Sequence, residues 1–190
     1  MAFVAQTLLT WLVFIAIVAA QPALHAQTEF GPHFADFPVE KVYDGPIGSP
    51  KFKSVSDEHY LRSLLSGMRD GPNFSGHFRL VQFRMGSGPL GAVLLESKTG
   101  SIYRLPHEIV QNEFFIHRTD CLAGLRGFRW AKASDEEDAS AALSFKTDSE
   151  LLVVRQCRVD GTAVERSYYR WHEHKWHFLK RLAGPPPPVF

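Results

Sequence analysis

The feature that most limits what this chain can fold into is a series of short apolar, β-branched and aromatic runs between residues 78 and 182. Sequences that favour tight turns separate several of them, including Asp148-Ser149-Glu150 and Asp160-Gly161. Short strands at close spacing predict a mainly β (α+β) protein, built as an antiparallel sheet, a sandwich or a set of propeller-like hairpins. The expected strands are 78–85, 92–97, 101–106, 113–118, 142–146, 151–157, 163–171 and 175–182.

One segment, 56–69, instead has the pattern of an amphipathic helix, which we expect to pack on the β domain. Ser56 can cap its start, and two acidic residues follow where the helix dipole favours negative charge. Arg69 suits the opposite end, and Gly71-Pro72 is expected to stop the helix. The residues expected on its packed face are Tyr60, Leu61, Leu64, Leu65 and Met68.

The remaining segments set the expected domain boundaries. Residues 27–50 hold repeated Gly and Pro, which predicts an extended arm ahead of a single β-rich domain over 51–182. The acidic run at 135–138 is expected to be an exposed loop, and the proline-rich tail at 183–190 a polyproline II extension. A chain of 190 residues with 45% apolar residues can bury one substantial core.

The amino-terminal segment predicts export. Residues 1–26 contain no Asp, Glu, Lys or Arg, and 8–20 form an apolar run that is short for a membrane span. This segment ends in Ala-Leu-His-Ala, which fits cleavage by signal peptidase after Ala26. The mature protein is then expected to be periplasmic or secreted, with no stable membrane insertion. The alternative is that the segment remains as an uncleaved anchor.

Export bears on the two cysteines, Cys121 and Cys157. An even cysteine count in an exported chain favours one disulfide between them. Closing a loop of about 36 residues is expected to stabilise the fold by about 3–4 kcal/mol in the loop-entropy model. The alternative is a pair of buried thiols.

A glycine-rich stretch resembles a nucleotide-binding loop at first sight. Gly86, Gly88 and Gly91 have the G-x-G-x-x-G spacing of dinucleotide and kinase phosphate loops. A dinucleotide site needs a helix next, whereas the residues that follow are β-rich. A kinase site fails too, because the "HRTD" at 117–120 has Thr119 in place of the catalytic Asp. The glycines are therefore predicted to form a hairpin turn, and no cofactor is expected.

The stretches "DGPNFSGHFRLVQFRMGSG" and "LLESKTGSIYRLP" resemble a family of small exported bacterial proteins of unknown function. The family pattern joins a G-P-N-F-A-G-H-Y motif to a glycine-rich hairpin with two cysteines, and the resemblance covers residues 50–182. It implies an exported β-rich protein and no established activity. Met85 and Pro89 stand where the family pattern has its cysteines. The residues that match the strongest motif are Gly71, Pro72, Asn73, Phe74, Gly76 and His77.

Asn73, His77 and Arg79 form the first candidate site. They open the first expected strand and are expected to gather at one end of the sheet. A neutral histidine can act as a base or ligand, so a small periplasmic hydrolase in the Asn73/His77 region is one hypothesis. Ser75 and Ser87 are potential nucleophiles, although neither lies in a G-x-S-x-G motif. The alternative is structural, with Asn73 closing a turn and His77 making one hydrogen bond.

A second candidate is the "WHEHKWH" sequence at 171–177. It departs from the zincin motif H-E-x-x-H because Trp176 stands where the second histidine would be. On strands, His172 and His174 would share a face and could hold a surface metal ion, which makes a weak metal-binding module another hypothesis. A solvated hairpin turn is the interpretation we favour, and no metal site is assigned.

The third candidate is a basic and aromatic surface. Residues 155–181 hold seven Arg or Lys against three acids, with Trp171 and Trp176 among them. Such a surface would bind an envelope protein or an anionic envelope polymer through charge and aromatic contact. The alternative is a sheet whose aromatic residues face the core and whose basic residues face water.

These observations predict an exported binding domain more readily than an enzyme. The formal net charge of +1 gives no reason to expect nucleic-acid binding. The leading hypothesis is a non-enzymatic protein that binds a protein or envelope component. Its expected binding residues are Asn73, His77, Arg79, Trp171 and Trp176.

Overall fold

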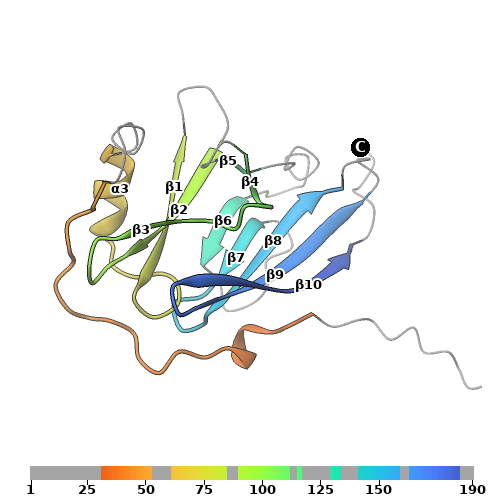
Figure 1. Cartoon of the computed structure of the whole chain (residues 1–190), viewed down its shortest axis with the longest axis horizontal. Coiled ribbons are helices and arrows are strands. Elements are labelled where there is room, and N and C mark those ends of the chain that lie inside the picture. The colour runs from red at the N-terminus through yellow and green to blue at the C-terminus, as the bar shows by residue number, and fades with distance from the viewer. Residues whose placement is uncertain are drawn as a thin grey trace, which may run out of the picture. The chain divides into compact units, whose positions relative to one another are not determined.

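Two five-stranded β-sheets account for most of the regular structure in this computed structural model (Figure 1). The part of the chain from residue 31 onward forms one compact unit, separate from residues 1–30. The arm is therefore continuous with the β domain from residue 31. The structure describes residues 31–52, 61–84, 90–111, 115–116, 129–133, 141–158 and 163–184.

Several predictions concern residues outside these ranges, and they stay predictions. The tail, for example, is described only as far as Gly184. The other segments and residues outside are the signal peptide at 1–26 with cleavage after Ala26, the start of the expected helix at 56–60, the turn residues 85–89, Cys121, the acidic run at 135–138 and the Asp160-Gly161 turn.

The first sheet is antiparallel and is built around a long hairpin. Strands β1 and β2 pair along their whole length, from Phe78 opposite Glu96 to Arg84 opposite Leu90. The sheet order is β1-β2-β5-β4, and β3 also pairs with β2. Its strands are β1 (Phe78–Arg84), β2 (Leu90–Glu96), β3 (Ile102–Arg104), β4 (Val110–Gln111) and β5 (Phe115–Ile116).

The β1–β2 hairpin corrects the nucleotide-loop resemblance. The glycine-rich stretch lies between two antiparallel strands, and Gly91 is itself in β2, opposite Phe83. A strand therefore follows the glycines where a dinucleotide site would need a helix N-terminus. The prediction of a hairpin connection is confirmed.

The second sheet has the order β10-β9-β8-β7-β6. Its pairs are antiparallel except β6 with β7, which run parallel, so the expectation of a purely antiparallel arrangement fails at this one pair. Strands β4 and β6 were also not expected from the sequence. The strands are β6 (Arg129–Ala133), β7 (Ala141–Phe145), β8 (Leu151–Cys157), β9 (Val164–His172) and β10 (Lys175–Ala183).

The two sheets pack on each other through one apolar core. Leu80 and Leu94 of the first sheet belong to the same buried cluster as Leu152 and Tyr169 of the second. Phe74, fully buried, packs edge-on against a phenylalanine of β7. The mainly β prediction is confirmed, in the form of two packed sheets.

The outer face of each sheet is covered as well. On the first sheet, Val81 and Val93 pack under the helix α3 (Leu61–Met68). On the second, Leu151 and Val153 pack under Phe34, which lies in the short 3-10 helix η1 (Phe34–Asp36) of the arm. Strands covered on both faces read as continuous apolar runs rather than as alternating patterns. This explains the sequences "AVLL" and "LLVV".

Helix α3 lies where the sequence placed it but presents a narrower apolar face. Leu64 and Met68 are buried against the first sheet, as predicted. Leu65 is 44% exposed, so its expected place on the packed face is wrong. Each residue turns about 100° around the helix axis, so the neighbour of Leu64 points away from the sheet. The helix stops before Gly71, whose φ is +74°.

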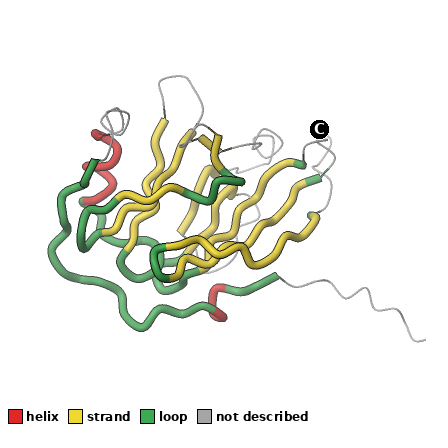
Figure 2. The backbone as a smooth tube through the Cα atoms, in the orientation of Figure 1, coloured by secondary structure: helices red, strands yellow, loops and turns green. Residues whose placement is uncertain are grey.

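The arm is held by backbone hydrogen bonds to the ends of both sheets (Figure 2). Val39 N donates to Asp148 O at 3.0 Å beside the second sheet, and Lys51 N donates to Gly100 O at 2.8 Å beside the first. In Figure 1 the arm runs below the sheets before the chain reaches α3. It is therefore a strap that joins the strand ends of the two sheets.

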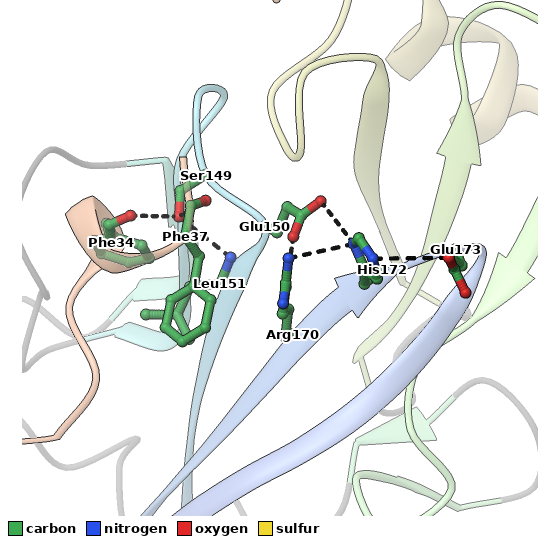
Figure 3. Close-up of polar contacts among 8 residues, drawn as sticks. All are labelled: Phe34, Phe37, Ser149, Glu150, Leu151, Arg170, His172 and Glu173. Atoms are coloured by element: carbon green, nitrogen blue, oxygen red, sulfur yellow. Dashed lines mark hydrogen bonds and ion pairs between the residues drawn. The ribbon is translucent and has the colours of Figure 1, made fainter. Parts of the chain in front are cut away.

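Ser149 provides a side-chain anchor for this strap. Its buried hydroxyl lies 2.8 Å from Phe34 O and 3.2 Å from Phe37 O, while Leu151 N donates to it (Figure 3). A hydroxyl that satisfies buried backbone groups on both the arm and β8 is costly to remove, because those groups lose their partner.

Replacing Ser149 by alanine should therefore lower the free energy of unfolding by about 1–2 kcal/mol, measured by urea denaturation. The matched control is Ser49→Ala, because Ser49 is an exposed serine of the same arm. Ser49→Ala should leave stability unchanged within about 0.5 kcal/mol. Equal effects of the two substitutions would show that the Ser149 hydroxyl does not anchor the arm.

Candidate functional site

A pocket of about 530 Å³ lies where the arm, the turn before β1 and the β9–β10 hairpin meet. Pro38, Val39, Phe78 and Trp171 form its apolar walls. The polar residues on its walls are Glu40, Lys41, Ser75, His77, Glu150, Arg170, His172, Glu173 and His174.

The turn that carries His77 into the pocket depends on an unusual backbone. Ser75 and Gly76 both have positive φ, at 44° and 74°. A Cβ at Gly76 would lie 2.8 Å from the carbonyl oxygen of Lys41, so only glycine fits beneath the arm. The "FSGH" sequence is therefore needed to bring the arm and the turn together.

Glu96 is a buried carboxylate approached by two imidazoles. It ends β2, and its Oε2 accepts hydrogen bonds from Thr99 Oγ1 at 2.5 Å and from Tyr103 OH at 3.5 Å. Its Oε1 lies 3.6 Å from His77 Nε2 and 3.8 Å from His174 Nε2. The carboxylate thus joins the turn before β1 to the β9–β10 hairpin.

Burial of the imidazole lowers the pKa of His77, and this effect outweighs the attraction of Glu96, which raises that pKa. His174 and Lys98 lower it further by charge repulsion. His77 is therefore neutral at neutral pH and gains its proton only below the usual pKa of histidine, about 6.5. Burial and the nearby Glu96 raise the pKa of Tyr103, which keeps its hydroxyl protonated.

A second carboxylate, Glu150, organises the other wall of the pocket (Figure 3). Arg170 Nε donates to its Oε2 at 2.6 Å, and His172 Nδ1 lies 3.3 Å from its Oε1. Arg170 Nη2 is also 3.3 Å from His172 Nδ1, which closes a three-residue cluster. The guanidinium lies over the ring of Phe37, 5.7 Å from its centroid, so the arm packs against this cluster.

The β9–β10 connection is a two-residue turn made by Glu173 and His174. Their φ angles are 49° and 59°, as in a type I′ turn, and His172 pairs with Lys175 across it. The predicted solvated hairpin turn is confirmed. His172 and His174 approach different carboxylates and do not share a face as two strand residues would. In the described ranges no group of three or more His, Cys, Asp or Glu is placed to hold a metal ion.

Glu173 occupies a backbone conformation that glycine adopts without strain. Glu173→Gly should therefore raise the free energy of unfolding by about 0.5–1 kcal/mol, seen as a higher urea midpoint. The control is Glu40→Gly, because Glu40 is also exposed and has no positive φ. Glu40→Gly should lower stability through added backbone entropy. The same sign of change for both substitutions would contradict the argument.

The structure separates Asn73 and Arg79 from His77. Asn73 makes two hydrogen bonds with the backbone of Leu80, its Nδ2 donating to Leu80 O and its Oδ1 accepting from Leu80 N. Arg79 donates to Gly71 O at 2.6 Å and pairs with Asp70 at 2.7 Å. Burial lowers the pKa of Arg79, while Asp70 raises it. These two residues line a different pocket, of about 570 Å³, beside α3.

The two tryptophans pack towards the core between the sheets. Trp171 is 3% exposed. Trp176 donates its indole N–H to Arg104 O at 2.8 Å and stacks on Phe74, with ring centroids 5.8 Å apart. The exposed aromatic residue of this hairpin is Phe178, at 53%. The tryptophans therefore hold the two sheets together.

Cys157, at the end of β8, is buried and is not a free thiol. Its expected partner, Cys121, lies outside the described residues, so the Cys121–Cys157 bond stays a prediction.

Sequence reasoning singled out His77, His172 and His174 but missed the carboxylates that hold them. Glu96 and Glu150 each adjoin a strongly apolar run, and an acid at the end of a buried strand is a detectable signal because it needs a partner. Nothing local to the sequence indicates which histidine meets which carboxylate.

Comparisons of the chain with protein-family models, curated proteins and solved structures find no match. The resemblance to the family of small exported bacterial proteins therefore stays a prediction. No helix in the described ranges is long and apolar enough to cross a membrane.

Proposed function

We propose that this protein is an exported, non-enzymatic binding protein, and that the histidine pocket holds an anionic group of an envelope component. The observation that carries the proposal is the gathering of His77, His172 and His174 with Arg170 and Lys41 around one pocket. Imidazole, guanidinium and ammonium groups are the side chains that donate hydrogen bonds to carboxylates and phosphates.

The charge of the pocket depends on pH. Counting its walls and Glu96, two fixed cations face four carboxylates while the histidines are neutral. Protonation of all three histidines raises the cations to five and reverses the sign of the net charge. A histidine with a lowered pKa carries this positive charge only below that pKa and loses it as the pH rises. An anionic ligand should therefore bind more tightly in mildly acidic solution.

The rival hypothesis, a hydrolase in the Asn73/His77 region, receives less support. Acyl transfer needs backbone or side-chain donors aimed at the developing oxyanion. The N–H groups of Ser75, Gly76 and His77 already donate to carbonyls, at 3.2, 2.6 and 2.8 Å. The Asn73 amide is likewise engaged with Leu80. The turn beside the pocket thus offers binding side chains and no donors for this step.

The test is titration calorimetry with a carboxylate-rich oligosaccharide, an alginate fragment, as the probe. Binding should be about tenfold tighter at about pH 5 than at about pH 7.5, because one added charge contact of about 1.4 kcal/mol corresponds to tenfold. A neutral dextran fragment should not bind at either pH.

His77→Gln should remove a large part of this pH dependence, since glutamine keeps hydrogen-bonding groups but cannot gain a proton. The matched control is His107→Gln, because His107 is an exposed histidine outside the pocket walls. Binding that is equal at both pH values, or that responds equally to the two substitutions, would sink the proposal. Turnover of the probe that is lost in Ser75→Ala would favour the hydrolase.

A further inference from the structure

Strand β10 is the terminal strand of the second sheet, and β9 is its pairing partner among the described strands. On a terminal strand, every other backbone N–H and C=O points away from the sheet. Such a row of donors and acceptors is able to pair with a further strand. β10 spans nine residues, which is long for an edge strand.

This edge also carries adjacent apolar side chains in water. Phe178 is 53% exposed and Leu179 is 36% exposed. Only three other large apolar side chains in the described ranges are as exposed, and they lie on the arm and on α3. Phe178 packs against Tyr169 of β9, with ring centroids 5.6 Å apart, so it stands on an ordered surface.

The charge of β10 has one sign. The strand contains Lys175, Lys180 and Arg181 together with His177, and no acidic residue. The Arg181 guanidinium lies over the Phe178 ring, 5.7 Å from its centroid, which places positive charge beside the exposed aromatic ring. A second copy of β10 would bring like charges together, whereas an acidic strand would be attracted.

Natural edge strands are often protected against pairing by charges and bulges, and β10 has a register irregularity between Phe178 and Lys180. Protection alone would not require two adjacent exposed apolar residues at this irregularity. We propose that β10 is a docking edge, and that its occupant is an extended acidic segment of a partner protein that adds a strand to the second sheet. This goes beyond the proposed function, because it uses a surface that is separate from the histidine pocket.

The probe is a synthetic peptide of alternating Glu and Val with blocked ends, labelled for fluorescence anisotropy. It should bind the mature protein, and raising the salt from about 0.05 to about 0.5 M should weaken the binding. A Lys–Val peptide of the same length should not bind. Methylating alternate backbone nitrogens of the Glu–Val peptide should abolish binding, because strand addition requires those N–H groups.

Phe178→Ser should weaken binding at least about tenfold, a loss of about 1.4 kcal/mol in binding free energy. Val42→Ser is the matched control, because Val42 is an exposed apolar residue of the arm, and it should bind as the unaltered protein does. Melting curves of both variants establish that they are folded. His77→Gln should leave peptide binding unchanged, which separates this surface from the pocket.

Several outcomes would overturn the docking edge. Equal binding of the methylated peptide would exclude strand addition, and equal binding by Phe178→Ser would exclude this surface. Self-association that Phe178→Ser abolishes would identify a second copy of the chain as the occupant instead. Tighter binding of the anionic polymer than of the peptide, sensitive to Phe178→Ser, would assign the edge to an envelope polymer.

Discussion

Both sheets carry apolar side chains on both faces, and this constraint determines most of the architecture. Packing the sheets together buries Leu94 and Leu152 but leaves Val93 and Val153 on the opposite faces. A sheet with two apolar faces needs a cover on each. Helix α3 and the arm supply the two outer covers, so both are parts of the packed structure rather than additions to it.

The histidine pocket is a consequence of how the arm provides its cover. To reach from the second sheet to α3, the arm crosses the strand ends, where Glu96 and Glu150 lie. Carboxylates that are removed from water in this way need hydrogen bonds and positive partners. Arg170 and the histidines supply them, so the same contacts that hold the strand ends together also present titratable groups to the pocket.

Local signals in the sequence predicted the elements well. The expected strands at 151–157 and 175–182 match β8 and β10 to within a residue, and the turn at Glu173 was expected from its position between two aromatic runs. These features depend on neighbours in the chain. The sequence also indicated two histidines of the pocket, because histidines close to turns are conspicuous.

Pairing between distant segments was beyond local signals. Alternation reveals which residues share a face of a strand, but it identifies the inward face only when the other face is polar. Here both faces are apolar, so nothing marked Trp171 as facing the partner sheet or β6 as parallel to β7. The meeting of Glu96 with His174 follows from that packing and was invisible for the same reason.

The anchoring of the arm by Ser149 has a consequence for the order of folding. The hydroxyl and Phe34 are 115 residues apart in the chain, so the segment that is synthesised first is placed only after the start of β8 exists. Contacts of such long range close late, because the chain entropy between them must be lost first. Until then the apolar outer face of the second sheet lies open, and the growing chain passes through a stage at which aggregation competes with completion.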